Sequence, residues 1–268
     1  YFVTLKQGLA GLGRTLVVNE MKRSSLLSVF GLAIVMLSDP SIAETFEDGH
    51  AAYDSGDYAA AFQIWKSLAD QGSPSAQYGL GEMYSLGLGV SRDDPEAAKW
   101  FGMAASSDHA PAQSRLGAMY DVGRGVPQSL SKAMKWYRKA AQQGDLPAQV
   151  SFGLIYGTGR GVPQNYFQAV KWFRLAAEQG DALAQYNLGL IYASGYEVVP
   201  RDDVQALVWF ILAARGGNKD ARKNHEAIVA RMSPEQVEKA QKFAEDWVNT
   251  KAQDKAAKCS MSGAVECK

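Results

Sequence analysis

The chain has 268 residues, of which 47% are hydrophobic and 21% charged, as is ordinary for a folded soluble protein. Lys and Arg together number 28, and so do Asp and Glu, so the formal net charge is zero. This balance argues against a nucleic-acid partner, which normally requires a basic patch or stripe.

The first 43 residues carry the pattern of an export signal. Two basic residues follow Met21, an apolar run covers residues 26–37, and small side chains precede a cleavage position after Ala43. We predict a signal peptide at 21–43 and interpret 1–20 as an upstream extension from a mis-assigned start; a buried N-terminal helix is the alternative. The apolar run is shorter than the roughly 20 residues of a membrane-spanning helix. We therefore expect an exported protein, periplasmic rather than secreted or surface-bound, without a stable membrane anchor.

An Ala-Gln pair recurs at a constant spacing through the middle of the chain. The pairs begin 36 residues apart, at Ala76, Ala112, Ala148 and Ala184. A fifth unit begins 37 residues later, at Ala221. A fixed period of this length is the signature of a helical repeat array, so we predict an all-α fold. We predict an N-terminal capping repeat at 44–75 and four full repeats at 76–220. C-terminal capping helices at 221–248 and a flexible tail at 249–268 follow.

Each full repeat begins with a predicted helix that contains a large apolar residue, a glycine and, three residues after the glycine, a tyrosine. A glycine inside a helix costs about 1 kcal/mol relative to alanine. We therefore expect the glycine to allow a neighbouring helix to approach closely, which a side chain would prevent. These glycines are Gly81, Gly117, Gly153 and Gly189.

The second predicted helix of each repeat has an amphipathic stripe of Ala, then Trp three residues later, then a pair of Ala. We expect each indole to be buried and to form a large part of the core of its repeat. On this interpretation Trp136→Ala or Trp172→Ala would cost about 3–5 kcal/mol. In the shorter N-terminal unit, Ile64 stands where the others have Trp. At the other end, Ser233 caps a helix that we expect to end near Trp247.

The combined pattern, Ala-x3-Leu-Gly-x2-Tyr-x2-Gly-x-Gly-Val followed by Ala-x2-Trp-x3-Ala-Ala-x2-Gly, resembles the Sel-1-like repeat family over about residues 46–247. The resemblance implies an α/α solenoid, a superhelix of stacked helix pairs, and adaptor or receptor-like roles in bacterial signalling, envelope assembly or host contact. By analogy with tetratricopeptide arrays, it also implies that the first helices line a concave face that binds a protein or peptide partner. The candidate contact residues on that face are Tyr78, Glu82, Asp121, Val150, Leu154, Tyr186 and Leu190. Tyr78 and Tyr186 lead this set, because aromatic residues are favoured in interface hot spots.

The sequence does not assemble a catalytic or metal site. His50, His109 and His225 are scattered, so we expect no bound metal, and we expect no cofactor. Ser129 and Lys132 match the motif Ser-x-x-Lys, but the accompanying Ser-Asp-Asn and Lys-Thr-Gly motifs are missing. Some exported, cysteine-rich members of the family carry a β-lactamase label. Their repeats each contain a Cys pair, which the repeats of this chain lack.

The two cysteines of the chain, Cys259 and Cys267, lie in the predicted tail. In an oxidising compartment they could close a small loop through a disulfide. In a reducing compartment they would remain thiols.

These observations predict a non-catalytic, exported scaffold that holds a protein or peptide partner on its concave face, in an adaptor or regulatory role in the bacterial envelope. A surface or secreted factor that contacts a host protein is the alternative within the same class. A β-lactamase or cell-wall hydrolase is the alternative from another class.

Overall fold

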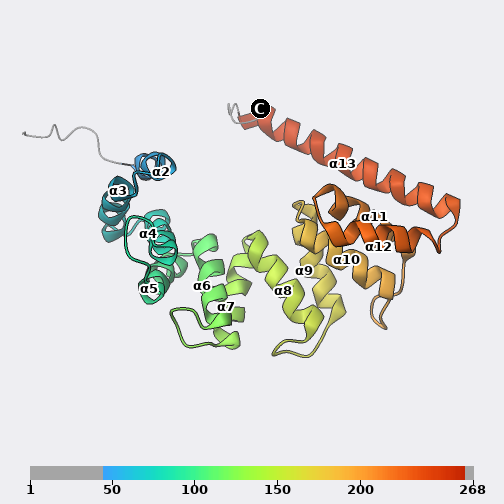
Figure 1. Cartoon of the computed structure of the whole chain (residues 1–268), viewed down its shortest axis with the longest axis horizontal. Helices are drawn as coiled ribbons and strands as arrows, with labels where there is room; N and C mark the ends of the chain where they lie inside the picture. Colours follow the sequence, from blue (N-terminus) through green and yellow to red (C-terminus); the bar gives the residue numbers. More distant parts are fainter. Residues whose placement is uncertain (1–44, 263–268) are drawn as a thin grey trace, which may run out of the picture. The chain divides into compact units, whose positions relative to one another are not determined.

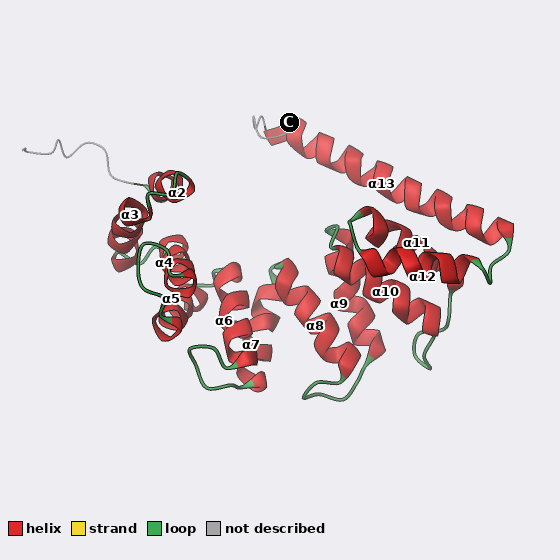
Figure 2. Cartoon of the chain, viewed as in Figure 1, coloured by secondary structure: helices red, strands yellow, loops and turns green. Residues whose placement is uncertain are grey.

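The computed structural model describes residues 45–262, which form twelve α-helices and contain no β-strand (Figures 1 and 2). These helices belong to one compact unit of the chain. The predicted extension at 1–20, the signal peptide at 21–43 and Cys267 lie outside the described residues, as does the side chain of Cys259. The cleavage of the signal and the pairing of the cysteines therefore stay predictions.

The helices alternate between two roles along the chain. The first helices of successive units are α2 (Phe46–Asp54), α4 (Pro74–Leu86), α6 (Ala110–Val122), α8 (Leu146–Thr158), α10 (Ala182–Ser194) and α12 (Lys219–Val229). The second helices are α3 (Tyr58–Asp70), α5 (Asp94–Ser106), α7 (Leu130–Gln142), α9 (Tyr166–Glu178) and α11 (Asp203–Arg215). From α2 to α12 each helix packs against the next along the chain. Contacts also join successive first helices from α6 to α12. The last helix, α13 (Pro234–Ser262), packs on α11. This arrangement confirms the predicted all-α solenoid of stacked helix pairs.

The turns between repeats need one residue with a positive φ angle. Gly144 and Gly180 adopt φ angles of 91° and 94°, and Asp108 supplies the same kind of conformation at 58°. Asp tolerates this region of conformational space better than most residues. The next helix begins directly afterwards, where Asp145 Oδ1 accepts a hydrogen bond from the Ala148 N–H at 2.9 Å. Local sequence therefore accounts for where the helices end and begin.

Each glycine of the Leu-Gly motif lies against an aromatic ring from the second helix of the same repeat. A Cβ atom at Gly81 would lie 2.5 Å from the Phe101 ring, and one at Gly153 would lie 2.4 Å from the Phe173 ring. The equivalent pairs are Gly117 with Tyr137 and Gly189 with Phe210, while Trp65 of the N-terminal unit lies against Gly49 and Gly79. The predicted close approach is confirmed, and the group that approaches the glycine is a ring of the paired helix.

The ring that packs against the glycine follows the repeated Trp by one position, and the expectation that each indole is buried is wrong for two of the four repeats. Trp136 and Trp172 are only half-buried, whereas their neighbours Tyr137 and Phe173 are 4% and 2% exposed. One residue along a helix turns the side chain by about 100°, so only the second of the two aromatic positions faces the glycine. The indole itself is buried in the first and last full repeats, at Trp100 and Trp209.

A buried glutamine joins each of the first helices α4, α6, α8 and α10 to the preceding second helix. Gln113 Nε2 donates a hydrogen bond to the carbonyl oxygen of Ala105 at 3.1 Å. The same bond, to the residue eight positions earlier, is made at 3.2, 3.3 and 3.1 Å by Gln77, Gln149 and Gln185. A buried amide without a partner costs about 1–3 kcal/mol, so these positions need both the glutamine and its acceptor. This bond explains why the Ala-Gln pair recurs in every full repeat.

Two of these buried glutamines have a further partner at the end of the second helix of their own repeat. Gln143 and Gln179, at the ends of α7 and α9, donate to the Oε1 atoms of Gln113 and Gln149 at 2.9 and 2.8 Å. Ser107 stands at the equivalent position after α5, and the buried Oε1 atom of Gln77 has no hydrogen-bond partner within the described residues. The first full repeat therefore lacks one bond that the next two repeats have.

Helix α13 is longer than the sequence predicted. The expected helix ended near Trp247 and was followed by a flexible tail at 249–268, but α13 continues to Ser262. No Gly or Pro interrupts the sequence between its second residue and this point, and Ala, Gln and Lys, all good helix formers, are frequent there. Ala240 and Ala244 are fully buried and belong to the same apolar cluster as α11.

Phe173→Ala should lower the free energy of unfolding by about 3–5 kcal/mol, because it deletes a ring that is packed against Gly153 in the core. Trp172→Ala is the matched control on the adjacent residue and should cost clearly less, because the indole is only half-buried. Urea unfolding followed by circular dichroism measures both losses. Equal losses for the two variants would contradict the assignment of the core position to Phe173.

Ser107→Gln should raise the free energy of unfolding by about 0.5–1.5 kcal/mol, because it supplies a donor for the unpartnered Gln77 Oε1. The reverse change, Gln143→Ser, should destabilise the protein, because it removes the equivalent donor from Gln113. The same unfolding measurement compares the two variants. A stabilisation by Gln at 107 that persists in a Gln77→Leu background would show that the gain has another origin.

Candidate functional site

The predicted contact residues lie in different environments. Val150 is 9% exposed and belongs to an apolar core cluster with residues of α9, α10 and α11, so the expectation that it faces a partner is wrong. Tyr186 is half-buried, and its hydroxyl accepts a hydrogen bond from Asn224 Nδ2 at 3.2 Å. Leu154 and Leu190 line one pocket between α8 and α10.

Tyr78 and Glu82 of α4 surround Arg115 of α6. The Arg115 Nε atom lies 2.9 Å from Glu82 Oε1. Burial raises the pKa of the Tyr78 hydroxyl, and a hydrogen bond with Arg115 opposes this rise. The rings of Tyr78 and His109 have centroids 5.1 Å apart, and burial lowers the pKa of His109. Tyr78 and Arg115 line a pocket of about 200 Å³, together with Asp145. Both charged residues of this lining have partners inside the protein, because Arg115 pairs with Glu82 and Asp145 accepts the Ala148 N–H.

Arginines from the loops close two junctions between successive first helices. Arg124, which follows α6, donates to the hydroxyl of Ser85 on α4, and its Nε atom lies 3.1 Å from Asp94 Oδ1. Arg160, which follows α8, donates to Asp121 Oδ2 on α6 at 2.8 Å. Asp121, one of the predicted contact residues, is therefore engaged within the protein, and its side chain is 11% exposed.

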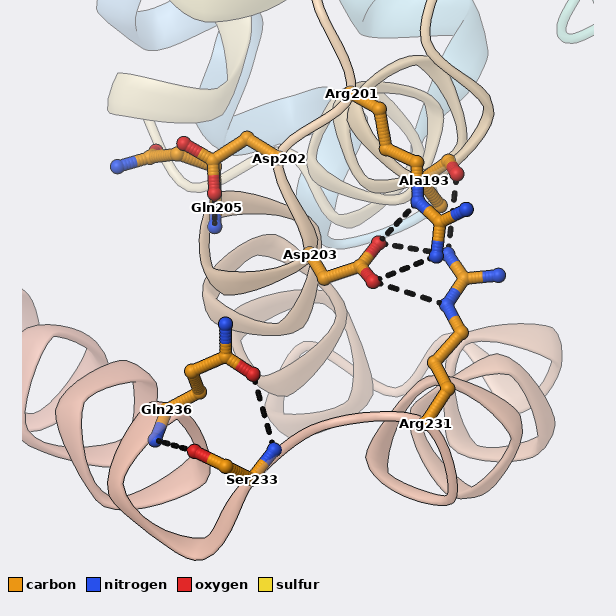
Figure 3. A network of polar contacts seen from close by, with 8 residues as sticks. All are labelled: Ala193, Arg201, Asp202, Asp203, Gln205, Arg231, Ser233 and Gln236. Carbon is orange, nitrogen blue, oxygen red and sulfur yellow. Dashed lines mark hydrogen bonds and ion pairs between the residues drawn. The ribbon is translucent and has the colours of Figure 1, made fainter.

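The junction between α10 and α12 is closed in the same way (Figure 3). Arg201 binds both carboxylate oxygens of Asp203, at 3.0 and 2.8 Å, and Arg231 binds them from the other side at 2.8 and 3.2 Å. Arg231 also donates to the carbonyl oxygen of Ala193 on α10 at 3.1 Å. The hydrogen bonds from Arg201 and then Arg231 lower the pKa of Asp203 below its ordinary range. An equivalent aspartate between two arginines stands at the start of α5, formed by Arg92, Asp94 and Arg124.

The junction between α8 and α10 lacks an arginine clamp. Tyr196 stands where the two preceding repeats have their loop arginine, and its ring stacks on Tyr166 with centroids 3.5 Å apart. Gly157 stands where α4 and α6 present the side chain that the arginine contacts. A Cβ atom at Gly157 would lie at ordinary contact distance from Ala169 and Phe173, 3.6 and 3.9 Å away. The result is a pocket of about 150 Å³. Its lining includes Leu154, Phe173, Leu190 and Ile191, and it contains no charged residue.

Leu154 and Leu190 were predicted from the sequence as contact residues, whereas Gly157, Tyr166 and Tyr196, which also line the pocket, were not. The signal was present in the alignment of the repeats with one another. Two successive repeats change together here: Gly157 replaces the side chain that the arginine contacts, and Tyr196 in the next repeat replaces the arginine.

The residues considered for chemistry have structural roles. Ser129 caps α7, and its Oγ atom accepts a hydrogen bond from the Lys132 N–H at 3.4 Å. The Lys132 ammonium lies 5.1 Å from the centroid of the Tyr120 ring. His109 caps α6 through its Nδ1 atom, which accepts a backbone N–H at 3.3 Å. In the part of the chain that the structure describes, no group of three or more His, Cys, Asp or Glu is placed to hold a metal ion.

None of the helices between residues 45 and 262 combines the length and the apolar character needed to cross a membrane.

Comparison with known proteins identifies relatives of the chain. The Sel1 repeat family matches residues 74–109, 110–145, 147–181 and 182–218, which together make up more than half of the chain. A Sel1 repeat protein from Oxalobacter formigenes is 34% identical, with a TM-score of 0.64 over 68% of this chain and 74% of that chain. The protein c5321, a protective antigen present in uropathogenic Escherichia coli strains that displays an SLR fold, is 31% identical with a TM-score of 0.65. That match covers 82% of this chain but 49% of the antigen, so this chain spans about half of its length. No curated protein matches the chain.

Proposed function

Because the chain belongs to the Sel1 repeat family, whose members are generally non-catalytic protein-interaction scaffolds, we propose that it binds a peptide segment of a partner protein along its first helices. One apolar side chain of that segment occupies the pocket between α8 and α10. The observation that carries this proposal is the uncharged lining of the pocket at the one junction, among those from α4 to α12, that has no arginine clamp.

The size of the pocket favours a side chain over a small molecule. Sites for small molecules usually have about 300–1,000 Å³, whereas this pocket has about 150 Å³. Its apolar surface continues outside the pocket, since Leu154 is 36% exposed and Leu183, one turn before the pocket on α10, is 45% exposed. Burial of such surface contributes about 25 cal/mol per Å², so this region offers more binding free energy than the neighbouring polar junctions.

Asn187 provides a place for the backbone of the bound segment. Its Nδ2 atom donates to the carbonyl oxygen of Leu183 at 2.8 Å. This bond fixes the amide group within the lining of the pocket and leaves its Oδ1 atom to accept an N–H from an extended peptide. An apolar anchor beside a single fixed acceptor is a common arrangement in peptide recognition, because the pocket selects the side chain and the acceptor selects its register.

A hydrolase is not part of the proposal. The Ser-x-x-Lys motif at Ser129 is used as a helix cap, and the Lys132 ammonium is directed toward the Tyr120 ring. A nucleophilic serine would need a base within hydrogen-bond reach of its hydroxyl. The arrangement therefore supports a binding role for this protein.

A photocrosslinking residue placed at Thr158, on the rim of the pocket, should capture a partner in cells that produce the protein, because the bound segment passes this position. Leu190→Gln should reduce that capture, since it makes the pocket wall polar. Leu175→Gln, a matched change of an exposed leucine on α9, should leave the capture unchanged. Equal capture in the two backgrounds would remove the pocket from the binding site.

The location that suits this function is the periplasm, and the export pattern at 21–43 supports it. A surface or secreted factor that contacts a host protein is a second candidate, supported by the 31% identity with the protective antigen c5321. An envelope adaptor and a host-contact factor would both bind their partner at the pocket between α8 and α10. The two candidates differ in whether the protein stays in the periplasm or reaches the cell exterior.

Osmotic-shock fractionation should release the protein in a form whose N-terminus is Glu44, because the signal peptide is removed on export. Protease treatment of intact cells should leave it uncut if it is periplasmic. Digestion by external protease would instead favour the host-contact candidate. Recovery of the uncleaved chain in the cytoplasmic fraction would contradict export itself.

A further inference from the structure

A basic recess lies on α7, on the side of this helix that is turned away from its buried residues. The recess has a volume of about 540 Å³ and is lined by the exposed Lys135, Arg138 and Lys139, over a floor that includes the half-buried Leu130 and Met134. Its lining contains no acidic residue. It is thus separate from the pocket between α8 and α10 in both place and chemistry.

The cations of this recess are short of partners within the described part of the protein. Lys135 and Arg138 make no ion pair or hydrogen bond there. The Lys139 ammonium lies 5.4 Å from the centroid of the Trp136 ring and 3.6 Å from Asp108 Oδ1, a carboxylate on a side chain that is 77% exposed. An ion pair of this kind contributes little, because water and salt screen it.

The other second helices do not carry such a group. On α5 the residue equivalent to Lys135 is Lys99, and it pairs with Glu96 at 2.9 Å. On α9, Lys171 and Arg174 stand at the positions of Lys135 and Arg138, but Leu175 replaces the third cation. Arg174 donates to the Tyr192 hydroxyl at 2.8 Å, and the Lys171 ammonium lies 5.9 Å from the centroid of the Trp172 ring. In α7 the cations follow one another without an acidic residue anywhere in the helix. The basic group is therefore a property of this one helix and not of the repeat.

The fold itself does not account for this group. Like charges three and four residues apart on a helix destabilise it, and Lys135 stands in that relation to both Arg138 and Lys139. The helix dipole favours cations in the last turn, which suits Lys139, but it opposes cations in the first turns. The chain as a whole carries no net charge, so a general basic composition is not the cause.

We propose that this recess binds an acidic peptide segment of a partner protein, with carboxylates on Lys135, Arg138 and Lys139 and an apolar side chain on the floor formed by Leu130 and Met134. The three cations span four residues of helix, which is roughly 6 Å and matches two or three neighbouring carboxylates. A nucleic acid needs cations spread along many phosphates, and this group is too short for that. The mixture of a charged rim and an apolar floor fits a peptide better than a simple anion.

The proposal is independent of the pocket between α8 and α10. A partner could engage either surface alone, and a partner that spans both would gain affinity from the linkage. The test below therefore addresses the basic recess alone.

Binding of a fluorescein-labelled hexaglutamate peptide to the mature chain, measured by fluorescence anisotropy, tests the proposal, with labelled hexaglutamine as the uncharged control peptide. Lys135→Gln/Arg138→Gln should weaken hexaglutamate binding by about tenfold, because two exposed charge contacts are lost. Lys239→Gln/Lys242→Gln on α13 is the matched control, with the same spacing and the same change in net charge, and it should bind like the wild type. Raising the salt concentration from roughly 50 to 300 mM should weaken wild-type binding as the charges are screened.

Three results would overturn the proposal. They are the absence of hexaglutamate binding to the wild type, an equal loss in the α13 control variant, and equal binding of hexaglutamine. Tight binding of anionic phospholipid vesicles by the wild type, lost in Lys135→Gln/Arg138→Gln without any hexaglutamate binding, would assign the recess to a membrane surface and likewise overturn it. Thermal unfolding of the variants by circular dichroism confirms that the compared proteins are folded.

Discussion

The contact between a helix glycine and an aromatic ring of the paired helix is the constraint on which the rest of the structure depends. At Gly81 and Gly153 any side chain would overlap the ring of Phe101 or Phe173. The absence of a Cβ atom therefore sets how closely the two helices of a repeat approach. The buried glutamine then joins each pair to the one before it, since Gln113 reaches the carbonyl oxygen at the end of α5. Together these two contacts make each repeat a similar unit, and they leave the outer positions free to vary.

The two proposed surfaces arise at positions where one repeat departs from the others. The clamp that closes the neighbouring junctions needs an arginine in the loop and an acceptor on the previous first helix. When both are replaced, by Tyr196 and Gly157, an uncharged pocket opens while the helices keep their packing. On α7 the departure is electrostatic, because Lys135 and Arg138 have no acidic neighbour within the helix. A repeat scaffold tolerates such changes because its core contacts lie on other faces of the same helices.

The pocket between α8 and α10 and the recess on α7 favour partners of different chemistry. The pocket between α8 and α10 offers apolar area and one fixed acceptor at Asn187, so it selects shape and register. The recess on α7 offers positive charge over a small apolar floor, so it selects acidic segments and speeds their approach. Both surfaces suit the protein-interaction role that the family generally has.

The sequence by itself determined the helical array, its period, the capped turns and the presence of a glycine-dependent contact, because these follow from local conformational preferences and from spacing along one helix. It also led to Leu154 and Leu190, which line the pocket between α8 and α10. Only the tertiary structure decided which aromatic residue meets the glycine, because Trp172 and Phe173 are adjacent and differ only in the direction of their side chains. The tertiary structure likewise decided that Val150 is buried, because α9, α10 and α11 supply the side chains around it. It also decided that Asp121 is paired, because Arg160 comes from the following repeat. The length of α13 lies between these two cases. Residues 249–262 contain many good helix formers, but their polar character led us to predict a flexible tail there. Contacts between repeats are long-range, and the spacing of residues within one repeat does not specify them.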